Sequence, residues 1–277
     1  MTRLIKSDYK KFFQDKLFLV VCILAVIFAV VTPLLYIVLF AFVGEDPMTE
    51  EMLSGLVSAK GQFFSSFSFG NNLGLIAPLL IGIILCKDFS SGTVRNKIIS
   101  GHSRISIFLS LFTVCFTTLF GIVLAHALLT LGISLPFFDY QPTPFVTADL
   151  WYFFESLLFE LLLYVFVAAF ISWLCVVMKN MGLVIVTYIA VVFGATMIGS
   201  ILQVVTMVLT EVDAGMEWLV DFLDFLQRIN VFMFSANIGL GTSYATSDVL
   251  SYVLPPLVGA AALLCHGILK FRRKDLK

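Results

Sequence analysis

Apolar and polar residues alternate along this chain in long blocks. Six apolar segments are separated by short polar stretches and cover about residues 17–43, 69–86, 105–135, 151–178, 181–209 and 249–269. A helix that crosses the ~30 Å hydrocarbon core of a bilayer needs ~20 apolar residues at a rise of ~1.5 Å each. Each segment is therefore predicted to be a transmembrane helix. The short second segment is expected to extend outward through the Phe- and Ser-rich stretch before it, and the long third one to be tilted.

The basic residues are distributed unevenly between the segments that connect the apolar ones. With the N-terminus in the cytoplasm, 15 of the 17 Lys and Arg residues fall in cytoplasmic segments, and only Lys60 and Arg228 fall outside. The fifteen are Arg3, Lys6, Lys10, Lys11, Lys16, Lys87, Arg95, Lys97, Arg104, Lys179, Lys270, Arg272, Arg273, Lys274 and Lys277. Short cytoplasmic loops accumulate Lys and Arg because these residues translocate poorly. An odd number of spans would divide them between the two sides, so the pattern predicts six spans with both termini in the cytoplasm.

The composition excludes an ordinary soluble domain. Hydrophobic residues make up 60% of the chain and charged residues 13%, and the mean hydropathy is +1.03, whereas a soluble domain is about half apolar and about a quarter charged. The five cysteines show no C-x-x-C spacing, so neither a disulfide framework nor a zinc site is expected. We expect residues 1–277 to form a single all-α transmembrane domain without a metal.

Two segments outside the spans have the pattern of amphipathic helices. The first 16 residues place Leu4, Tyr9 and Phe12 on one side of a helix, which predicts an interfacial helix on anionic lipid in preference to a frayed basic tail. On the outer side, acidic residues recur at helical spacing against apolar ones around 217–229, which predicts an external amphipathic helix. The apolar stretch 230–241 is too short to cross, and it leaves two alternatives: a re-entrant segment, or simple packing against the spans.

The cytoplasmic segment between spans two and three, CKDFSSGTVRNKIISGHSRISIFLS, holds the most informative motif. Thr93 to Ile99 is expected to form a short helix in which Arg95 and Lys97 are placed to meet a partner. The acidic residue and the serines that precede it are candidate capping residues. Gly101 permits a break before Arg104 starts the third span. A helical turn that is directly connected to two spans could transmit a movement of a soluble subunit to those spans.

On these residues the chain resembles the ABC-2-type permeases of ATP-binding-cassette exporters. The shared pattern is an acidic residue, then Gly-Thr, a basic amphipathic turn and a Ser-Arg pair before the third span. This chain matches it with Asp88, Gly92, Thr93, Val94, Arg95, Asn96, Lys97, Ile98, Ile99, Ser103 and Arg104. The family more often has Glu where Asp88 stands, and commonly Pro where this chain has Gly101 and His102. The likeness also includes the N-terminal helix, the six spans and the long outer region, so it covers nearly the whole chain.

The resemblance implies a function and a set of partners. In that family the turn after span two is a coupling helix that docks into a cleft of the ATPase subunit, and two six-span permeases enclose the transport path. The expected partners are an ATP-binding-cassette ATPase subunit and a second permease chain, identical or different, in a bacterial cytoplasmic membrane. This chain has no P-loop, so it is expected to be no enzyme and to hold no cofactor, with ATP and Mg²⁺ in the partner subunit. The expected cargo is a hydrophobic or amphipathic compound, a peptide or a lipid, and no nucleic acid.

Two ionisable residues are predicted to lie within the spans at one depth. His126 and Glu160 each lie nine residues inward from the outer end of their segment, which places both ~13 Å below the outer surface, where they could pair. A charged side chain at the centre of a span costs at least ~2.5 kcal/mol, so both are functional candidates. One interpretation is a polar patch that lines the translocation path. The favoured one is structural, a hydrogen-bonded pair between spans three and four or a protonated glutamate.

Two other classes of function fit the sequence less well. An intramembrane enzyme such as a protease needs a nucleophile with a base, or paired acids and histidines, and the three histidines show no metal-ligand spacing. A stand-alone ion-coupled transporter is expected to have inverted repeats and helices broken at the midplane. Pro33 and Pro78 could break spans one and two, but no repeat is visible.

Overall fold

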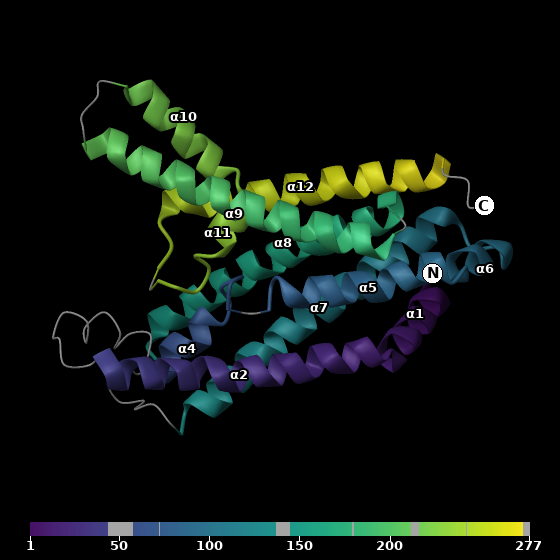
Figure 1. Cartoon of the computed structure of the whole chain (residues 1–277), viewed down its shortest axis with the longest axis horizontal. Helices are drawn as coiled ribbons and strands as arrows, with labels where there is room; N and C mark the ends of the chain where they lie inside the picture. The colour runs from purple at the N-terminus through teal and green to yellow at the C-terminus, as the bar shows by residue number, and fades with distance from the viewer. Residues whose placement is uncertain are drawn as a thin grey trace.

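The computed structural model describes residues 1–43, 58–71, 73–136, 145–178, 180–211, 216–241 and 243–273. This part of the chain is built from helices and the turns between them, and it contains no strand (Figure 1). The prediction of an all-α fold is therefore confirmed for the described residues.

Among the described residues, five helices are long and apolar enough to cross a membrane. They are α2 (Lys16–Val43), α7 (Arg104–Ser134), α8 (Thr147–Met178), α9 (Met181–Glu211) and α12 (Thr246–Arg273). Each covers one of the predicted spans, with ends that differ by a few residues. Continuous apolar sequence is sufficient to define these helices, because every backbone donor and acceptor in a bilayer core must be satisfied within the segment.

The structure changes the second predicted span. In place of one helix over 69–86, α5 (Ile76–Ser90) begins later and ends later, and its 15 residues reach only ~22 Å. Leu73 has a φ of 65°, so its backbone leaves the helical region. A short helix, α6 (Thr93–Ile99), follows α5 at an angle of 55°, and only the two together are long and apolar enough to count as a sixth span.

The chain before α5 is folded against the rest of the protein. The helix α4 (Ala59–Ser65) is followed by turns up to α5. The backbone N–H of Phe69 donates to the carbonyl oxygen of Ser235 at 3.2 Å, and the Ser68 hydroxyl donates to that of Ala236 at 2.7 Å. The Tyr188 hydroxyl donates to the Gly74 carbonyl oxygen at 2.8 Å. Tertiary partners thus replace helical hydrogen bonds where the predicted span is irregular.

The stretch 230–241 packs against the spans. It forms α11 (Val231–Ser235) and a loop, and α11 contacts α8, α9 and α12. In the loop, the backbone N–H groups of Gly239 and Gly241 donate to the hydroxyl oxygens of Tyr244 at 2.9 Å and Tyr152 at 3.0 Å. Packing on the spans, one of the two alternatives for this stretch, is therefore present, and protein groups shield its backbone.

The long helices divide into a central pair and a periphery. More than half of the apolar part of α7 and of α8 is buried, whereas less than a quarter of the corresponding part of α2, α9 and α12 is buried. In Figure 1, α7 and α8 run through the middle of the bundle, with α2 below and α9 and α12 above. The exposed surface of the outer helices is apolar, as a lipid-facing or subunit-facing surface requires.

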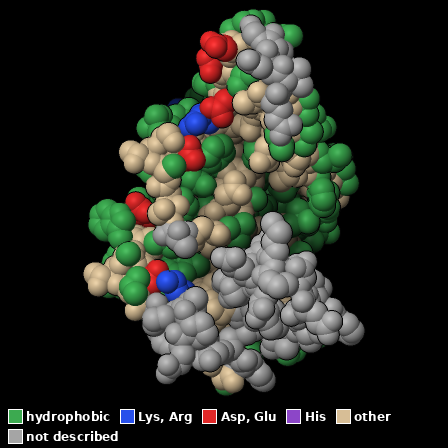
Figure 2. All heavy atoms as spheres, turned by 90° about the vertical axis from the view of Figure 1, so that its left-hand side faces the viewer, with side chains coloured by type: hydrophobic (Ala, Val, Ile, Leu, Met, Phe, Trp, Pro, Cys, Tyr) green, Lys and Arg blue, Asp and Glu red, His purple; other side chains and the backbone are tan. Residues whose placement is uncertain are grey.

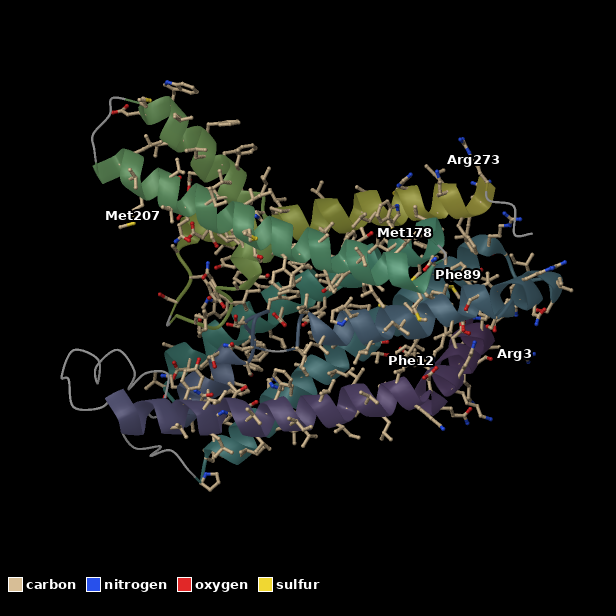
Figure 3. All side chains as sticks on the ribbon, in the orientation of Figure 1. Arg3, Phe12, Phe89, Met178, Met207 and Arg273 are labelled. Carbon is tan, nitrogen blue, oxygen red and sulfur yellow. The ribbon has the colours of Figure 1, made fainter. Side chains whose placement is uncertain are left out.

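The two ends of the bundle differ in charge. The last turn of α12 lies with α6 and α1 (Thr2–Gln14) at one end of the bundle, where α1 also packs against α7 (Figure 1). We call this the basic end, and Figure 3 labels Arg3 and Arg273 there. At the opposite end, which we call the acidic end, α10 (Glu217–Arg228) packs along α9 and forms the predicted amphipathic helix. Figure 2 shows acidic side chains spread over that end, with few basic ones.

Candidate functional site

The predicted coupling segment forms a short helix between two glycines of positive φ. Gly92 precedes α6 with a φ of 72°, and Gly101 follows it with a φ of 87°. The left-handed region favours glycine, so both ends of the helix are fixed by residue type. Ser103 then caps α7 by accepting a hydrogen bond from the backbone N–H of Ser106 at 3.2 Å. The third span therefore starts where it was predicted to start. The N-cap of α6 is Gly92 and not one of the predicted capping residues.

One face of α6 is held by the protein and the other is exposed. Val94 is buried, and the Lys97 ammonium lies 2.6 Å from an Asp8 carboxylate oxygen and 3.2 Å from one of Asp88. The opposite face presents three exposed residues, Arg95, Asn96 and Ile99. Ile99 has 73% of its surface exposed. Of the two cations predicted to meet a partner, Arg95 lies on the exposed face, whereas Lys97 is paired with Asp8 and Asp88 within the chain.

A cluster of charges holds α6 to α1, α5 and α7, and we call it the charged clasp. It consists of Asp8, Lys11, Asp15, Lys87, Asp88, Lys97 and Ser110. Asp88, in the last turn of α5, pairs with both Lys11 and Lys97. The Ser110 hydroxyl, on α7, donates to Asp8 at 2.6 Å. Buried charges are tolerated only when paired and hydrogen-bonded, and the clasp satisfies this condition with groups from four helices.

Asp15 connects the first two helices to the clasp. Its carboxylate accepts a hydrogen bond from the backbone N–H of Leu17 at 2.9 Å, and it receives the Lys87 ammonium at 2.8 Å and 3.0 Å. Burial alone would raise the pKa of Asp15. The hydrogen bonds from Lys87 and Leu17 and the charge of Lys87 outweigh burial, and they hold the pKa below its ordinary value of 3.8.

Arg104 fixes the end of the last helix. Its guanidinium donates to the carbonyl oxygens of Phe271 at 3.2 Å and Arg272 at 3.1 Å. The last carbonyl groups of a helix have no intrahelical partner and carry partial negative charge, so a cation there is stabilising. The predicted motif residue therefore links the start of α7 to the end of α12.

His126 and Glu160 lie on α7 and α8, the helices that correspond to predicted spans three and four. They do not form the predicted hydrogen-bonded pair. His126 on α7 and Glu160 on α8 are 1% and 0% exposed. Both ring nitrogens of His126 lack a hydrogen-bond partner among the described residues. The hydroxyls of Thr118, Thr130 and Ser134 also lack one, and these residues lie four or eight positions from His126 along the same face of α7. By contrast, Thr113 on the same helix donates to the Leu109 carbonyl oxygen at 2.8 Å.

The sequence reasoning missed the acidic half of the charged clasp. A usable signal was present: Asp8, Asp15 and Asp88 are acidic residues inside segments that are otherwise basic. Such residues need partners when they are buried, and the nearest candidates were the lysines of the same side. Which lysine meets which aspartate depends on how α1 packs on α7, and local spacing does not encode that packing.

No model of a known protein family matches this chain, and no curated protein matches it. The interpretation of these sites therefore rests on the residues and their geometry.

Proposed function

We propose that this chain is the transmembrane permease subunit of an ATP-binding-cassette exporter of the ABC-2 type. In this proposal, α6 is the coupling helix, a separate ATPase subunit binds ATP and Mg²⁺, and the chain itself is no enzyme. The cargo is a hydrophobic or amphipathic compound, a peptide or a lipid. The basic end faces the cytoplasm of a bacterial cell, with both termini on that side of the cytoplasmic membrane.

The geometry of α6 is the observation that carries the proposal. A docking element needs an exposed contact face and a rigid connection to the spans behind it. The exposed contact face consists of Arg95, Asn96 and Ile99, which are one cation, one amide and one large aliphatic side chain. The charged clasp and the buried Val94 provide the rigid connection to the spans.

A force on α6 would be distributed over several helices. Lys97 pairs with Asp8 on α1 and Asp88 on α5, while Arg104 binds the end of α12. Displacement of α6 by a partner would therefore move α1, α5 and the cytoplasmic ends of α7 and α12 together. This is the behaviour that coupling of ATP hydrolysis to an alternating permease requires.

The surface of the outer helices supports a membrane position and a second chain. The peripheral helices α2, α9 and α12 expose large apolar side chains along much of their length. Lipid covers part of such a surface, and a second permease chain, identical or different, covers the remainder in our proposal.

His126 and Glu160 are assigned a structural role in this proposal. Both lie inside the packed pair α7 and α8, essentially without exposed surface. Transport by a Glu160→Gln variant is expected to equal that of the parent. A loss of transport with unchanged folding would instead place Glu160 in the translocation path.

A stand-alone ion-coupled transporter is the second candidate, and one observation favours it. Residues 66–71 and 73–75 are non-helical, as are residues 236–241 and 243–245. The two stretches meet inside the protein, where the Ser68 hydroxyl donates to the Ala236 carbonyl oxygen and the Phe69 N–H donates to that of Ser235, the last residue of α11. Irregular backbone shielded by protein is a feature of such transporters. Transport by the purified chain without any ATPase would favour this candidate over the exporter.

The test of the exporter is assembly with an ATPase. The neighbouring reading frames are searched for a P-loop protein, the chain is co-expressed with it, and co-purification and ATPase activity are measured. Arg95→Glu and Ile99→Asp change only the exposed face of α6, and each is expected to weaken assembly at least tenfold while the melting temperature stays within about 2 °C.

Two control variants separate docking from folding. Lys10→Glu makes the same charge change on an exposed face of α1 and is expected to leave assembly unchanged. Lys97→Met removes a clasp charge and is expected to lower the free energy of unfolding by about 3 kcal/mol, because it leaves Asp8 and Asp88 short of a cation. Full assembly of both α6 variants, or transport without bound ATPase, would reject the proposal.

A further inference from the structure

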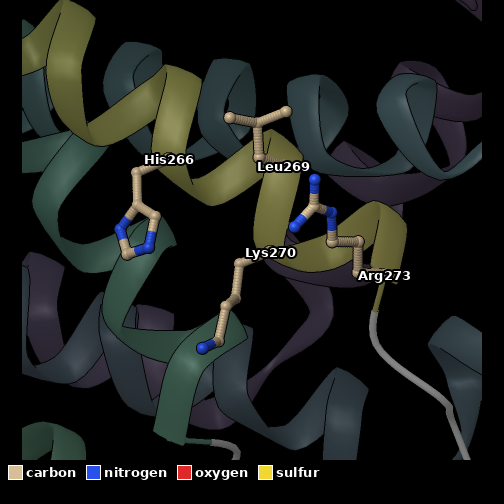
Figure 4. A pocket seen from close by; sticks show the side chains of 4 residues that line it. All are labelled: His266, Leu269, Lys270 and Arg273. Carbon is tan, nitrogen blue, oxygen red and sulfur yellow. The ribbon is translucent and has the colours of Figure 1, made fainter.

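The last turns of α12 border a surface hollow with an unusual lining. The hollow has a volume of about 530 Å³ and is lined by His266, Leu269, Lys270 and Arg273 (Figure 4). At 3.6 residues per turn these positions fall within about 100° of the helix circumference and span about 10 Å along its axis. Two permanent cations, one imidazole and one exposed leucine therefore share one small surface at the basic end.

The two cations of the hollow have no anionic partner among the described residues. Neither Lys270 nor Arg273 forms an ion pair with any of them. At the same end of the bundle, Lys11, Lys87 and Lys97 are all matched by aspartates of the charged clasp. The charge at the hollow is thus left for a ligand outside the chain.

The hydrogen bond between His266 and Trp173 shows which ring nitrogen of His266 accepts. The indole N–H of Trp173 donates to His266 Nδ1 at 2.8 Å. An indole nitrogen can only donate, so Nδ1 is the acceptor, and the proton of the neutral ring is on Nε2. Nε2–H is therefore a donor on a residue that lines the hollow together with Lys270 and Arg273.

We infer that this hollow binds the phosphate headgroup of an anionic phospholipid in the leaflet at the basic end. An Arg fork and a Lys point charge are the usual protein groups for phosphate oxygens. Leu269, 52% exposed beside them, offers apolar contact to the glycerol and the first acyl carbons, which a free phosphate ion could not use. Trp173 lies five residues, or ~8 Å, before the end of α8, and aromatic residues near the ends of spans favour the membrane interface. The inference requires that the apolar helices lie in a bilayer, and it does not depend on an ATPase partner.

The test measures lipid binding by the purified full-length chain with native mass spectrometry, using phosphatidylglycerol and phosphatidylcholine as probes. Phosphatidylglycerol is expected to bind the parent more tightly than phosphatidylcholine. Lys270→Gln and Arg273→Gln are each expected to weaken phosphatidylglycerol binding about fivefold, the value for one basic residue near a membrane surface, and the double variant more strongly. Binding of phosphatidylcholine is expected to change less than twofold.

Arg272→Gln is the matched control. It removes the same charge from the adjacent position, which is exposed but does not line the hollow. Its phosphatidylglycerol binding is expected to equal that of the parent, and all variants are expected to keep the parent melting temperature because the changed side chains are exposed.

Three results would overturn the inference. The first is equal binding of the two lipids by the parent, and the second is an equal loss for Arg272→Gln and Arg273→Gln, which would indicate a diffuse basic surface. The third is displacement of phosphatidylglycerol by 10 mM inorganic phosphate, which would indicate a site for free phosphate. The inference would be supported if phosphatidylglycerol stays bound to the parent in 10 mM phosphate and binds less tightly to the double variant.

Discussion

At the scale of single residues, the buried ionisable and polar groups fall into two kinds. Those at the basic end are paired: Asp8, Asp88 and Lys97 are nearly buried and satisfy one another. Those on the central face of α7 are not, because His126 and Thr130 lack partners among the described residues. Removal of one member of a pair at the basic end leaves a buried charge or donor unsatisfied, so it should lower the stability of the protein. Removal of an unpaired polar group on α7 should leave the stability unchanged or raise it.

The first prediction concerns His126. His126→Leu replaces an unpaired imidazole by an apolar group of similar size, and it is expected to leave the free energy of unfolding unchanged or to raise it by up to ~2 kcal/mol. Ser110→Ala is the control, because it removes the hydroxyl that donates to Asp8 and is expected to cost about 1 to 3 kcal/mol. Thermal unfolding in detergent measures both. A clear loss of stability in His126→Leu would show that the imidazole is hydrogen-bonded in the folded protein.

The second prediction is a pH dependence that arises at Asp15. The pKa of this carboxyl is lower in the folded chain than its ordinary value of 3.8, so its stabilising contribution is complete above pH 3.8 and is lost as the pH falls through the folded value. Asp15→Asn is therefore expected to be less stable than the parent at pH 7, and the difference is expected to shrink below pH 3.8. Melting temperatures from pH 7 to pH 3 measure it. A difference that stays constant would contradict the ion pair with Lys87.

At the scale of elements, short helices and turns hold the positions that matter most for the proposals. The helix α6 has seven residues and cannot be stable by itself, so its tertiary contacts with α1 and α5 maintain it. The loop after α11 likewise depends on contacts with α4 and α8. In both, a glycine of positive φ marks the point where the backbone direction changes.

The third prediction concerns the glycine in that loop. Gly239 has a φ of 76°, and a Cβ added there would lie 1.9 Å from the Phe64 carbonyl oxygen on α4. Gly239→Ala is therefore expected to lower the free energy of unfolding by more than about 2 kcal/mol. Gly241→Ala is the matched control, because the nearest atom to its added Cβ is 3.5 Å away. Equal melting temperatures of the two variants would show that the loop does not pack on α4.

At the scale of the whole molecule, charge and shape give the bundle a direction. The helices α1 and α6 and the last turn of α12 lie at the basic end, and α10 lies at the acidic end (Figures 1 and 2). The two basic residues at the acidic end are both neutralised, Lys60 by Asp149 at 2.7 Å and Arg228 by Asp224 at 2.6 Å. Unmatched positive charge is thus concentrated at one end, as expected for a protein oriented by its cytoplasmic lysines and arginines.

The fourth prediction tests this orientation. Alkaline phosphatase fused after residue 243 is expected to be active, because the enzyme folds only outside the cytoplasm, and the same enzyme fused after residue 277 is expected to be inactive. A fluorescent protein that folds only in the cytoplasm should give the opposite result at each site. Activity of alkaline phosphatase at residue 277 would contradict the proposed placement of the basic end.

The sequence by itself determined the long helices. Runs of more than 20 apolar residues such as 105–135 have only one stable form in a bilayer, so local composition is enough to locate α7 and its neighbours. The short helix α6 was also predictable, because Gly101 permits a break after it and Ser103 is a typical N-cap for the helix that follows. The uneven distribution of Lys and Arg also predicted an orientation in the membrane, and this prediction needs no information on contacts between helices.

Only the tertiary structure decided how these elements are joined. The break before α5 depends on hydrogen bonds to Ser235 and Ala236, which lie more than 160 residues further along the chain. The pairing of Asp8 and Asp88 with Lys97, and the absence of a hydrogen bond to His126, follow from which helix faces meet. Local sequence fixes which residues form a helix and which face of it is polar. The partner of that face is set by the packing of distant segments, and the charged clasp and the hollow on α12 are consequences of that packing.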